Sequence, residues 1–281
     1  MAFNVGEDVE VIGGDDHFKF ALYSASIRDS RPDGLKVVYD NRETQEGNRL
    51  IQIVPMSQVR PIPNAIVAML REQDDVEPWL SGGWWRGVLV GKVGLSCIVY
   101  LDYMPKSKQY LVLAEEELRV PQEWSFIDNH EIWIYKKIIP DDAFQVGAEV
   151  EVVGDEGIYR YAVRRGRIRS VEGENFEVEY HHLQNADGSP IIETVNASKV
   201  RYVPDAVVGI LRRHDLVEAW MDGVWWQGIV KSVTPHSAIL YFGYKEAEMK
   251  FVIIPIERLR VHQTWHKSGM YAIWIYRKQS D

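Results

Sequence analysis

Cysteine is almost absent from this sequence. Cys97 is the single cysteine among 281 residues, so no disulfide can form within the chain. It stands in the apolar, β-branched run SCIVYL, a setting typical of a buried small side chain. The scarcity of cysteine predicts a protein of a reducing compartment, either the cytosol or the nucleus.

Long hydrophobic runs are missing as well. No stretch of the chain is apolar enough to cross a bilayer, which predicts a protein without a membrane partner. The first residues, MAFNVGEDVEV, are acidic and lack the basic and apolar regions of a secretory signal. We therefore expect the glycosylation sequon at Asn196 to remain unmodified.

The short motifs of common catalytic sites do not occur. The chain has no G-x-S-x-G, no H-E-x-x-H, no C-x-x-C and no phosphate-binding glycine loop. His262 and His266 are four residues apart, but no third metal ligand is obvious near them. The sequence therefore predicts a protein that is not an enzyme and that holds no metal or cofactor.

Positive charge is in short supply. The 32 lysines and arginines are outnumbered by 41 acidic residues, which gives a net charge of −9. Proteins that bind phosphate backbones normally carry a basic surface, because counterion release drives that binding. The charge therefore favours a basic partner over nucleic acid. Nucleic-acid binding through the basic cluster of Arg164, Arg165, Arg167 and Arg169 is a weaker alternative.

An internal repeat dominates the chain. VGEDVEVIG begins at Val5 and VGAEVEVVG begins at Val146, an offset of 146 − 5 = 141 residues. The same offset maps three further motifs of the first half onto the second: the tryptophan pair of GGWWRGVLV, then LRVPQEW, then IWIY. A constant offset across four separated matches means that the two halves align without gaps.

Each half divides again. The VEV motif at Val9 and Val150 recurs in altered form at Val76 and Val217, which predicts four units at 1–63, 64–140, 141–204 and 205–281. Short alternating segments such as EVEVVG, LKVVYD and KFVIIP read as strands, and Asp187-Gly188 supplies a tight turn. The apolar spacing predicts a short helix near Ala65–Glu72 and another near Ala206–Arg213. We therefore predict an all-β protein of four small bent barrels in two tandem pairs, with one short helix in each pair.

The sequence resembles a known family at this level. VEYHHLQNADGSPIIETVNASKVR (178–201) and WMDGVWWQGIV (220–230) are similar to the tandem Agenet domains of plant proteins, which are Tudor-like barrels of the Royal superfamily. The resemblance implies a nuclear, chromatin-associated module that recognises a histone tail or another basic peptide. It also implies that the first barrel of a pair encloses a methylated lysine in an aromatic cage, held by cation–π contacts, while the second barrel supports it.

One family position is changed in both repeats. The strand that reads approximately F-R-G-x-W-Y in the family has Leu22 and Val163 where the family has its cage tryptophan, and Phe20 and Tyr161 where it has glycine. Residues two apart on a strand share a face, so a ring displaced along the strand could replace the missing one. The alternative is that the cage is lost.

The candidate ligand-binding residues follow from this resemblance. In the aligned order they are Phe18, Phe20, Tyr23, Tyr39 and Asp40 in the first repeat, and Tyr159, Tyr161, Tyr180 and His181 in the second. Each ring could equally belong to an ordinary barrel core. Because His181 replaces Asp40, the two pairs need not share a ligand.

The tryptophans are expected to be structural. Adjacent strand residues face opposite ways, so one of Trp84 and Trp85 should be core while the other meets the sister barrel or solvent. Two functions stay open: recognition of a basic histone tail, with or without a methylated lysine, or an adaptor in a chromatin complex that binds an unmodified protein partner.

Overall fold

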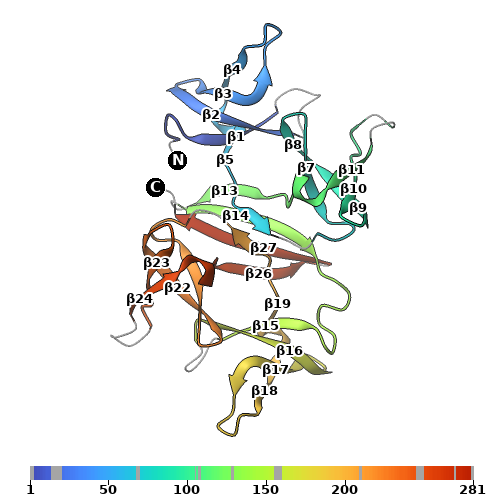
Figure 1. The fold of residues 1–281 in the computed structure, drawn as a ribbon, viewed down its shortest axis with the longest axis vertical. Coiled ribbons are helices and arrows are strands. Elements are labelled where there is room, and N and C mark those ends of the chain that lie inside the picture. Colours follow the sequence, from blue (N-terminus) through green and yellow to red (C-terminus); the bar gives the residue numbers. More distant parts are fainter. Residues whose placement is uncertain are drawn as a thin grey trace. The chain divides into compact units, whose positions relative to one another are not determined.

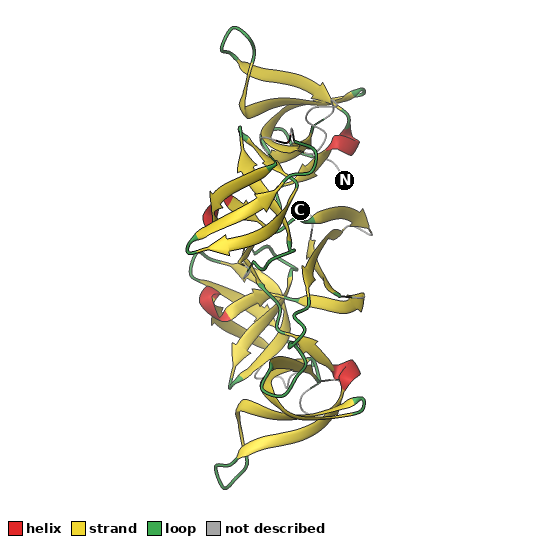
Figure 2. Ribbon diagram, turned by 90° about the vertical axis from the view of Figure 1, so that its right-hand side faces the viewer, coloured by secondary structure: helices red, strands yellow, loops and turns green. Residues whose placement is uncertain are grey.

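The structure is a computed structural model that describes residues 3–13, 21–67, 70–104, 106, 109–127, 130–154, 160–208, 211–244, 250–268 and 270–279. It divides into two compact units, Met1–Phe126 and Ile127–Asp281. Strands make up both units, and the helices among the described residues are single short turns (Figure 2). Among the described residues, no helix has the length and hydropathy of a membrane span. The predicted all-β class is confirmed.

The first barrel of the first unit is a strongly bent antiparallel sheet. Its strands run in the order β4-β3-β2-β1-β5 (Figure 1). Their bounds are Asp8–Ile12 (β1), Ala21–Arg31 (β2), Gly34–Glu43 (β3), Arg49–Val54 (β4) and Val59–Pro61 (β5), with the turn η1 at Met56–Gln58. Alternate residues of β2, including Tyr23, Ala25 and Ile27, are buried in the barrel core. This period-2 burial is the pattern that half-buried strands produce.

The second barrel begins with a tight hairpin. Ser81 and Gly82 both have positive φ, +50° and +81°, as a two-residue type I′ turn requires. This turn joins β7 to β8, and β7 also pairs with β9 and β12. The bounds are Asp75–Leu80 (β7), Gly83–Trp85 (β8), Gly87–Val93 (β9), Ser96–Tyr100 (β10), Tyr110–Ala114 (β11), Glu115–Glu117 (η3) and Leu118–Arg119 (β12). The strand Ala65–Val67 (β6) precedes this barrel along the chain, and Glu123–Ile127 (β13) follows it.

The second unit repeats this arrangement. Its first barrel holds Glu149–Val153 (β15), Ala162–Glu172 (β16), Asn175–Gln184 (β17), Pro190–Asn196 (β18), Ala197–Lys199 (η5) and Val200–Tyr202 (β19). The rest comprises His130–Ile138 (β14), Ala206–Val208 (β20), Leu216–Met221 (β21), Val224–Val233 (β22), Ser237–Tyr241 (β23), Phe251–Pro255 (β24), Ile256–Arg258 (η7), Leu259–Val261 (β25), Gln263–Ser268 (β26) and Tyr271–Gln279 (β27). The predicted turn at Asp187-Gly188 is confirmed, with Gly188 at φ +84°.

Buried ion pairs lock the two barrels of each unit together. Glu10, 1% exposed, binds Arg60 and Arg119, and Arg119 also binds Glu77 of the second barrel at 2.7 Å. The residues 141 positions later, Glu151, Arg201, Arg260 and Glu218, form the same network in the second unit. Strand pairing adds to this junction, since β2 pairs β8 and β16 pairs β22.

The last strands of the two repeats pair with each other inside the second unit. β14 and β27 lie side by side and antiparallel (Figure 1). Ile134 faces Ile275, its own counterpart at the 141-residue offset, so the strands β14 and β27 are related by a local twofold axis. The limits of the four units predicted from the sequence repeat stay a prediction. In the structure, residues 127–140 belong to the second compact unit, in which β14 pairs with β27.

The two short helices predicted from apolar spacing are wrong. Residues Ala65–Val67 and Ala206–Val208 are strands, and residues 68–69 and 209–210 lie outside the described residues. β-branched side chains are common in both segments and favour a strand over a helix. Asp74 and Asp215 then accept the backbone N–H of Arg71 and Arg212, respectively, so that a turn follows each strand.

Candidate functional site

The described tyrosines of the predicted cage are buried in the first barrel. Tyr23 on β2 is 2% exposed, and Tyr39 on β3 is 3% exposed. Their rings meet edge to face at 6.2 Å, and the Tyr39 hydroxyl donates to Gln52 at 3.0 Å. Phe18 and Phe20 lie outside the described residues.

This aromatic pair already holds a cation from the same chain. The Arg42 guanidinium carbon lies 4.7 Å from the centre of the Tyr23 ring and 5.3 Å from that of Tyr39. Both distances fall within the range of a cation–π contact, roughly 6 Å. The side chain that would compete with a methylated lysine here is therefore Arg42.

The second unit builds the same arrangement from a different position. Arg164, the counterpart of Tyr23, lies 4.5 Å from the centre of the Tyr180 ring. Glu193 accepts hydrogen bonds from both the Tyr180 hydroxyl and Arg164, at 2.8 and 2.6 Å. Tyr180 is 2% exposed, and Tyr159 lies outside the described residues.

Tyr161 has a more exposed side chain than the other described aromatic candidates, Tyr23, Tyr39 and Tyr180. It is 40% exposed, has φ +67° and packs against Tyr244 at 4.8 Å. The neighbouring family position, Val163, is paired with Trp225 across the barrel junction, as Leu22 is with Trp84. The place of the family tryptophan is thus used to join two barrels in this chain.

The tryptophan pairs divide as predicted. Trp85 and Trp226 are buried, whereas Trp84 and Trp225 are half-buried at the junction between barrels. Arg119 lies 4.4 Å above the Trp84 ring, and Arg260 lies 4.2 Å above Trp225. These rings are therefore part of the junction that holds the barrels together.

A pocket of about 500 Å³ opens beside this junction in the first unit. It is lined by Asp40, Asn41, Glu43, Trp79 and Gly82. The first three come from the end of β3, and the last two come from the β7–β8 hairpin of the second barrel. A Cβ at Gly82 would lie 2.9 Å from Asn41, so only glycine allows the hairpin to approach this closely.

The pocket is acidic and aromatic. Asp40 and Glu43 are exposed, and no described residue forms an ion pair with either carboxylate. The Trp79 ring is held by Trp84, edge to face at 5.0 Å. Two unneutralised carboxylates beside a fixed indole suit a cationic side chain. The carboxylates attract a cation by charge pairing and hydrogen bonds, and the indole face attracts it by a cation–π contact.

The corresponding place in the second unit has a different chemistry. At the matched positions, Asp40, Asn41 and Glu43 are replaced by His181, His182 and Gln184. Trp79 and Gly82 are conserved between the repeats as Trp220 and Gly223. His181 contacts the Glu149 carboxylate at 2.6 Å, and the His182 ring meets Trp220 edge to face at 5.2 Å. Burial raises the pKa of Glu149, but hydrogen bonds from His181 and Arg167 outweigh it and lower the pKa overall. The second unit therefore lacks the pair of unneutralised carboxylates.

Among the residues that line this pocket, the sequence predicted a ligand-binding role only for Asp40. Asn41, Glu43, Trp79 and Gly82 were missed, because Glu43 and Trp79 are 36 residues apart and belong to different barrels. The available signal was the change from Asp40 and Glu43 to His181 and Gln184 at otherwise matched positions.

The described residues contain no cluster that could hold a metal ion. His262, one of the pair spaced four apart, instead contacts the Glu218 carboxylate at 2.9 Å.

Comparison with known proteins agrees with this architecture. The geometry defines a tandem array of small Tudor-like β-barrels. Residues 6–64 and 147–205 match the Agenet domain, so the chain contains two Agenet domains and the resemblance read from the sequence is confirmed. Tandem Agenet domains are reader-type modules associated with chromatin, and the family is one of binding modules.

A curated relative comes from a plant. Protein AGENET DOMAIN (AGD)-CONTAINING P1 of Arabidopsis thaliana is 25% identical over 94% of the chain, and the chain spans only 55% of that protein's length. Similar solved structures include AGD34 of Arabidopsis thaliana AGDP1 and tandem Agenet domain 3-4 of ADCP1. The first is 24% identical, with a TM-score of 0.40, over 44% of this chain and 85% of that one. The second is 24% identical, with a TM-score of 0.38, over 44% of this chain and 83% of that one.

Proposed function

We propose that this chain is a nuclear, chromatin-associated binding protein whose first unit captures a cationic side chain of a basic histone-tail segment. The cation enters the pocket of Asp40, Asn41, Glu43, Trp79 and Gly82. The observation that carries the proposal is the pair of carboxylates, unneutralised by any described residue, beside the Trp79 ring. The module binds its ligand and catalyses no reaction on it.

The chemistry of this pocket sets an order among methylation states. A carboxylate binds most strongly a cation that still donates N–H hydrogen bonds. An aromatic cage instead rewards the poorly hydrated trimethylammonium group. With two carboxylates and one indole, the pocket favours lysine that retains at least one N–H over trimethyllysine.

A second candidate function is an adaptor that binds an unmodified basic partner. Arg42 favours it, because this residue occupies the Tyr23–Tyr39 pair where a methyl-lysine cage was expected. The two candidates differ in one measurable property, the dependence of affinity on lysine methylation.

The test is a binding titration of the full chain with fluorescent histone-tail peptides. Each peptide is used unmodified, mono-, di- and trimethylated at one lysine, and with that lysine replaced by alanine. We expect Asp40→Asn with Glu43→Gln to weaken binding by about five- to tenfold, the effect of losing two partly exposed charge contacts. The matched control is His181→Asn with Gln184→Ala in the second unit, which should leave this binding unchanged.

A reciprocal variant tests sufficiency. His181→Asp with Gln184→Glu installs both carboxylates at the matched place in the second unit and should add a second binding event. Equal binding by wild type and the Asp40/Glu43 double variant would refute the site. Equal affinity for all methylation states, with binding still lost in that variant, would select the adaptor.

A further inference from the structure

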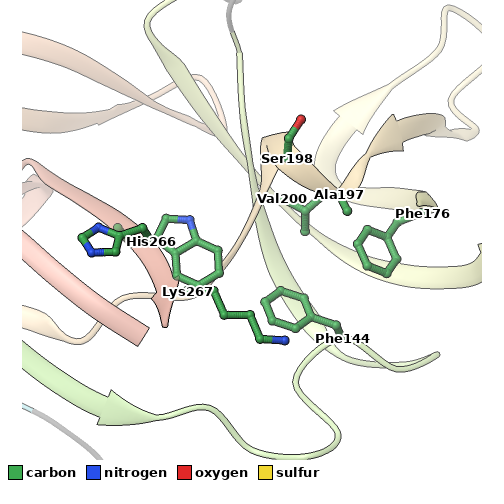
Figure 3. Close-up of a pocket in the computed structure, with 8 residues that line it drawn as sticks. Phe144, Phe176, Ala197, Ser198, Val200, His266 and Lys267 are labelled. Carbon is green, nitrogen blue, oxygen red and sulfur yellow. The ribbon is translucent and has the colours of Figure 1, made fainter. Parts of the chain in front are cut away.

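A second pocket lies in the second unit and shares no residue with the acidic one. Its volume is about 450 Å³, and it is lined by Phe144, Phe176, Ala197, Ser198, Val200, Trp265, His266 and Lys267 (Figure 3). Phe144 precedes β15, Phe176 lies on β17, and the last three residues belong to β26. Nothing in the proposed function of the first unit uses this pocket.

One side of the pocket is a stack of aromatic rings. Phe144 stacks on Phe176 at 6.2 Å and on Trp265 at 6.1 Å, with interplanar angles of 24° and 26°. Trp265 stacks in turn on the buried Trp274 at 5.7 Å. Because the stack is anchored on a core residue, the rings present a fixed apolar surface to a ligand.

The opposite side is small and rigid. Ala197 and Ser198 form the turn η5, in which the Asn196 side chain accepts hydrogen bonds from the Ser198 backbone N–H and hydroxyl at 3.0 and 2.7 Å. The methyl side chain of Ala197 leaves room beside the rings. In the first repeat the matched residue is Met56, which is three heavy atoms longer.

The mouth carries positive charge. Lys267 and His266 are exposed, and no described residue forms an ion pair with either. The Lys267 side chain extends toward the Phe144 side of the pocket (Figure 3). The matched residues of the first repeat are Ser125 and Phe126, so this cation belongs to the second unit alone.

We propose that this pocket binds a protein segment in which a large apolar side chain stands next to an acidic residue. The apolar side chain fills the space between the rings and Ala197, and the neighbouring carboxylate pairs with Lys267. The occupant is a peptide rather than a nucleic acid, because binding of a phosphate backbone needs several cations. Lys267 is the one lysine or arginine among the lining residues, on a chain of net charge −9.

In the experiment, the full, isotopically labelled chain is titrated with short peptides of glycine and serine that carry two probe residues, and binding is monitored by NMR. The probe carries Phe-Asp at its centre, and the matched peptides carry Phe-Asn, Phe-Lys and Gly-Asp. We expect Phe-Asp to bind best, Phe-Asn about threefold more weakly and Gly-Asp at least tenfold more weakly. The indole signal of Trp265 should move with the first peptide.

Two variants locate the site. Ala197→Met fills the space with the residue of the first repeat and should abolish Phe-Asp binding. Lys267→Glu changes an exposed residue, leaves the rings intact and should reverse the preference from Phe-Asp to Phe-Lys. Arg258→Glu, an exposed charge reversal outside the lining, is the control for net charge and should change nothing.

The outcomes are decisive even if Ala197→Met fails to fold, since Lys267→Glu tests the same pocket from its surface. Equal binding of Phe-Asp and Gly-Asp overturns the proposal, as does an unchanged preference in Lys267→Glu. Tight binding of a single-stranded oligonucleotide that displaces the peptide would also overturn it. Histone-tail titrations of the same variants separate this site from the acidic pocket, whose binding should be unaffected.

Discussion

At the scale of single residues, Arg42 controls access to the ring pair of the first barrel. Its guanidinium lies 4.7 Å from the centre of the Tyr23 ring and 5.3 Å from that of Tyr39. Arg42→Ala removes this resident cation and leaves two ring faces for an added one. We expect the affinity for a trimethyllysine peptide to rise by roughly two- to thirtyfold, the worth of a cation–π contact of about 0.5–2 kcal/mol. Fluorescence anisotropy with matched peptides measures it, and an unchanged preference for methylation would contradict it.

Tyr161 belongs to the surface of its unit. It is 40% exposed and its ring packs at a tilt against Tyr244, so it contributes little to a core. Tyr161→Ala should lower the free energy of unfolding by about 0.5–1.5 kcal/mol, the worth of one aromatic pair. Urea denaturation of the variant provides the value. A loss of about 3–5 kcal/mol, typical of a truncated core aromatic, would show that the ring is part of the core after all.

At the scale of elements, the buried ion-pair networks that join the barrels differ between the two units, because the second network has an additional histidine. Burial raises the pKa of Glu218, but Arg201 and Arg260, with His262, outweigh it and hold the pKa far below its ordinary value of 4.5. In the matched network the same desolvation prevails over Arg119 and Arg60 and raises the pKa of Glu77. The difference accompanies the change from Pro121 to His262.

These directions predict opposite responses to acid. A lowered pKa in the folded state means that Glu218 stabilises the fold above pH 4.5, and that this contribution is lost as the pH falls, by about 1.4 kcal/mol per pH unit. Glu77, with a raised pKa, instead favours the fold at low pH. Glu218→Gln should therefore flatten the decline of unfolding free energy below pH 4.5, whereas Glu77→Gln should remove a gain in unfolding free energy that accompanies acidification toward pH 4.5 from above. Urea denaturation over a pH series tests this, and equal slopes in both variants would refute it.

The β14–β27 pair offers an internal comparison of two matched tryptophans. Trp133 stacks on Tyr276 and Trp274 stacks on Tyr135, each at 6.4 Å, and both indoles are 1% exposed. Truncation of either to alanine should cost about 3–5 kcal/mol of unfolding free energy. Trp274 also contacts Trp265 and Arg201, and the Trp133 indole N–H donates to Glu131 at 3.3 Å, so the two truncations should destabilise the protein by similar amounts. Denaturant melts of the two variants give both values, and a loss well below this range in either variant would count against this account of the sheet.

At the scale of the whole molecule, net charge decides the salt dependence of binding. A chain of net charge −9 attracts a basic tail through partly exposed carboxylates. Salt screens such charges beyond roughly 8 Å at physiological ionic strength, so the affinity for a basic peptide should fall as salt is added. Titrations at low and high salt check this, with an uncharged variant of the peptide as the control. Affinity that does not change, or tight binding of plain duplex DNA, would contradict it.

The sequence by itself determined the features that depend on neighbouring residues. Alternating burial along segments such as β2 and β16 follows from the period-2 geometry of a strand, and the glycine of Asp187-Gly188 supplies the positive φ of its turn. The gap-free offset and the Agenet motifs likewise lie in the order of residues alone. Even at this level, apolar spacing gave two false helices, because a short apolar run suits either element and a turn aspartate ended each one.

Only the tertiary structure decided which distant residues meet. It brought Glu43 to Trp79 through a hairpin glycine, placed Arg42 on the rings expected to hold a ligand, and paired the last strands of the two repeats at Ile134 and Ile275. Such contacts depend on how far a side chain reaches and which strand edge is open, and neither is encoded in the spacing of residues along one strand. The same physical reason explains why the acidic pocket was found in part and the aromatic pocket was not: their walls come from separate strands that only the packed barrels bring together.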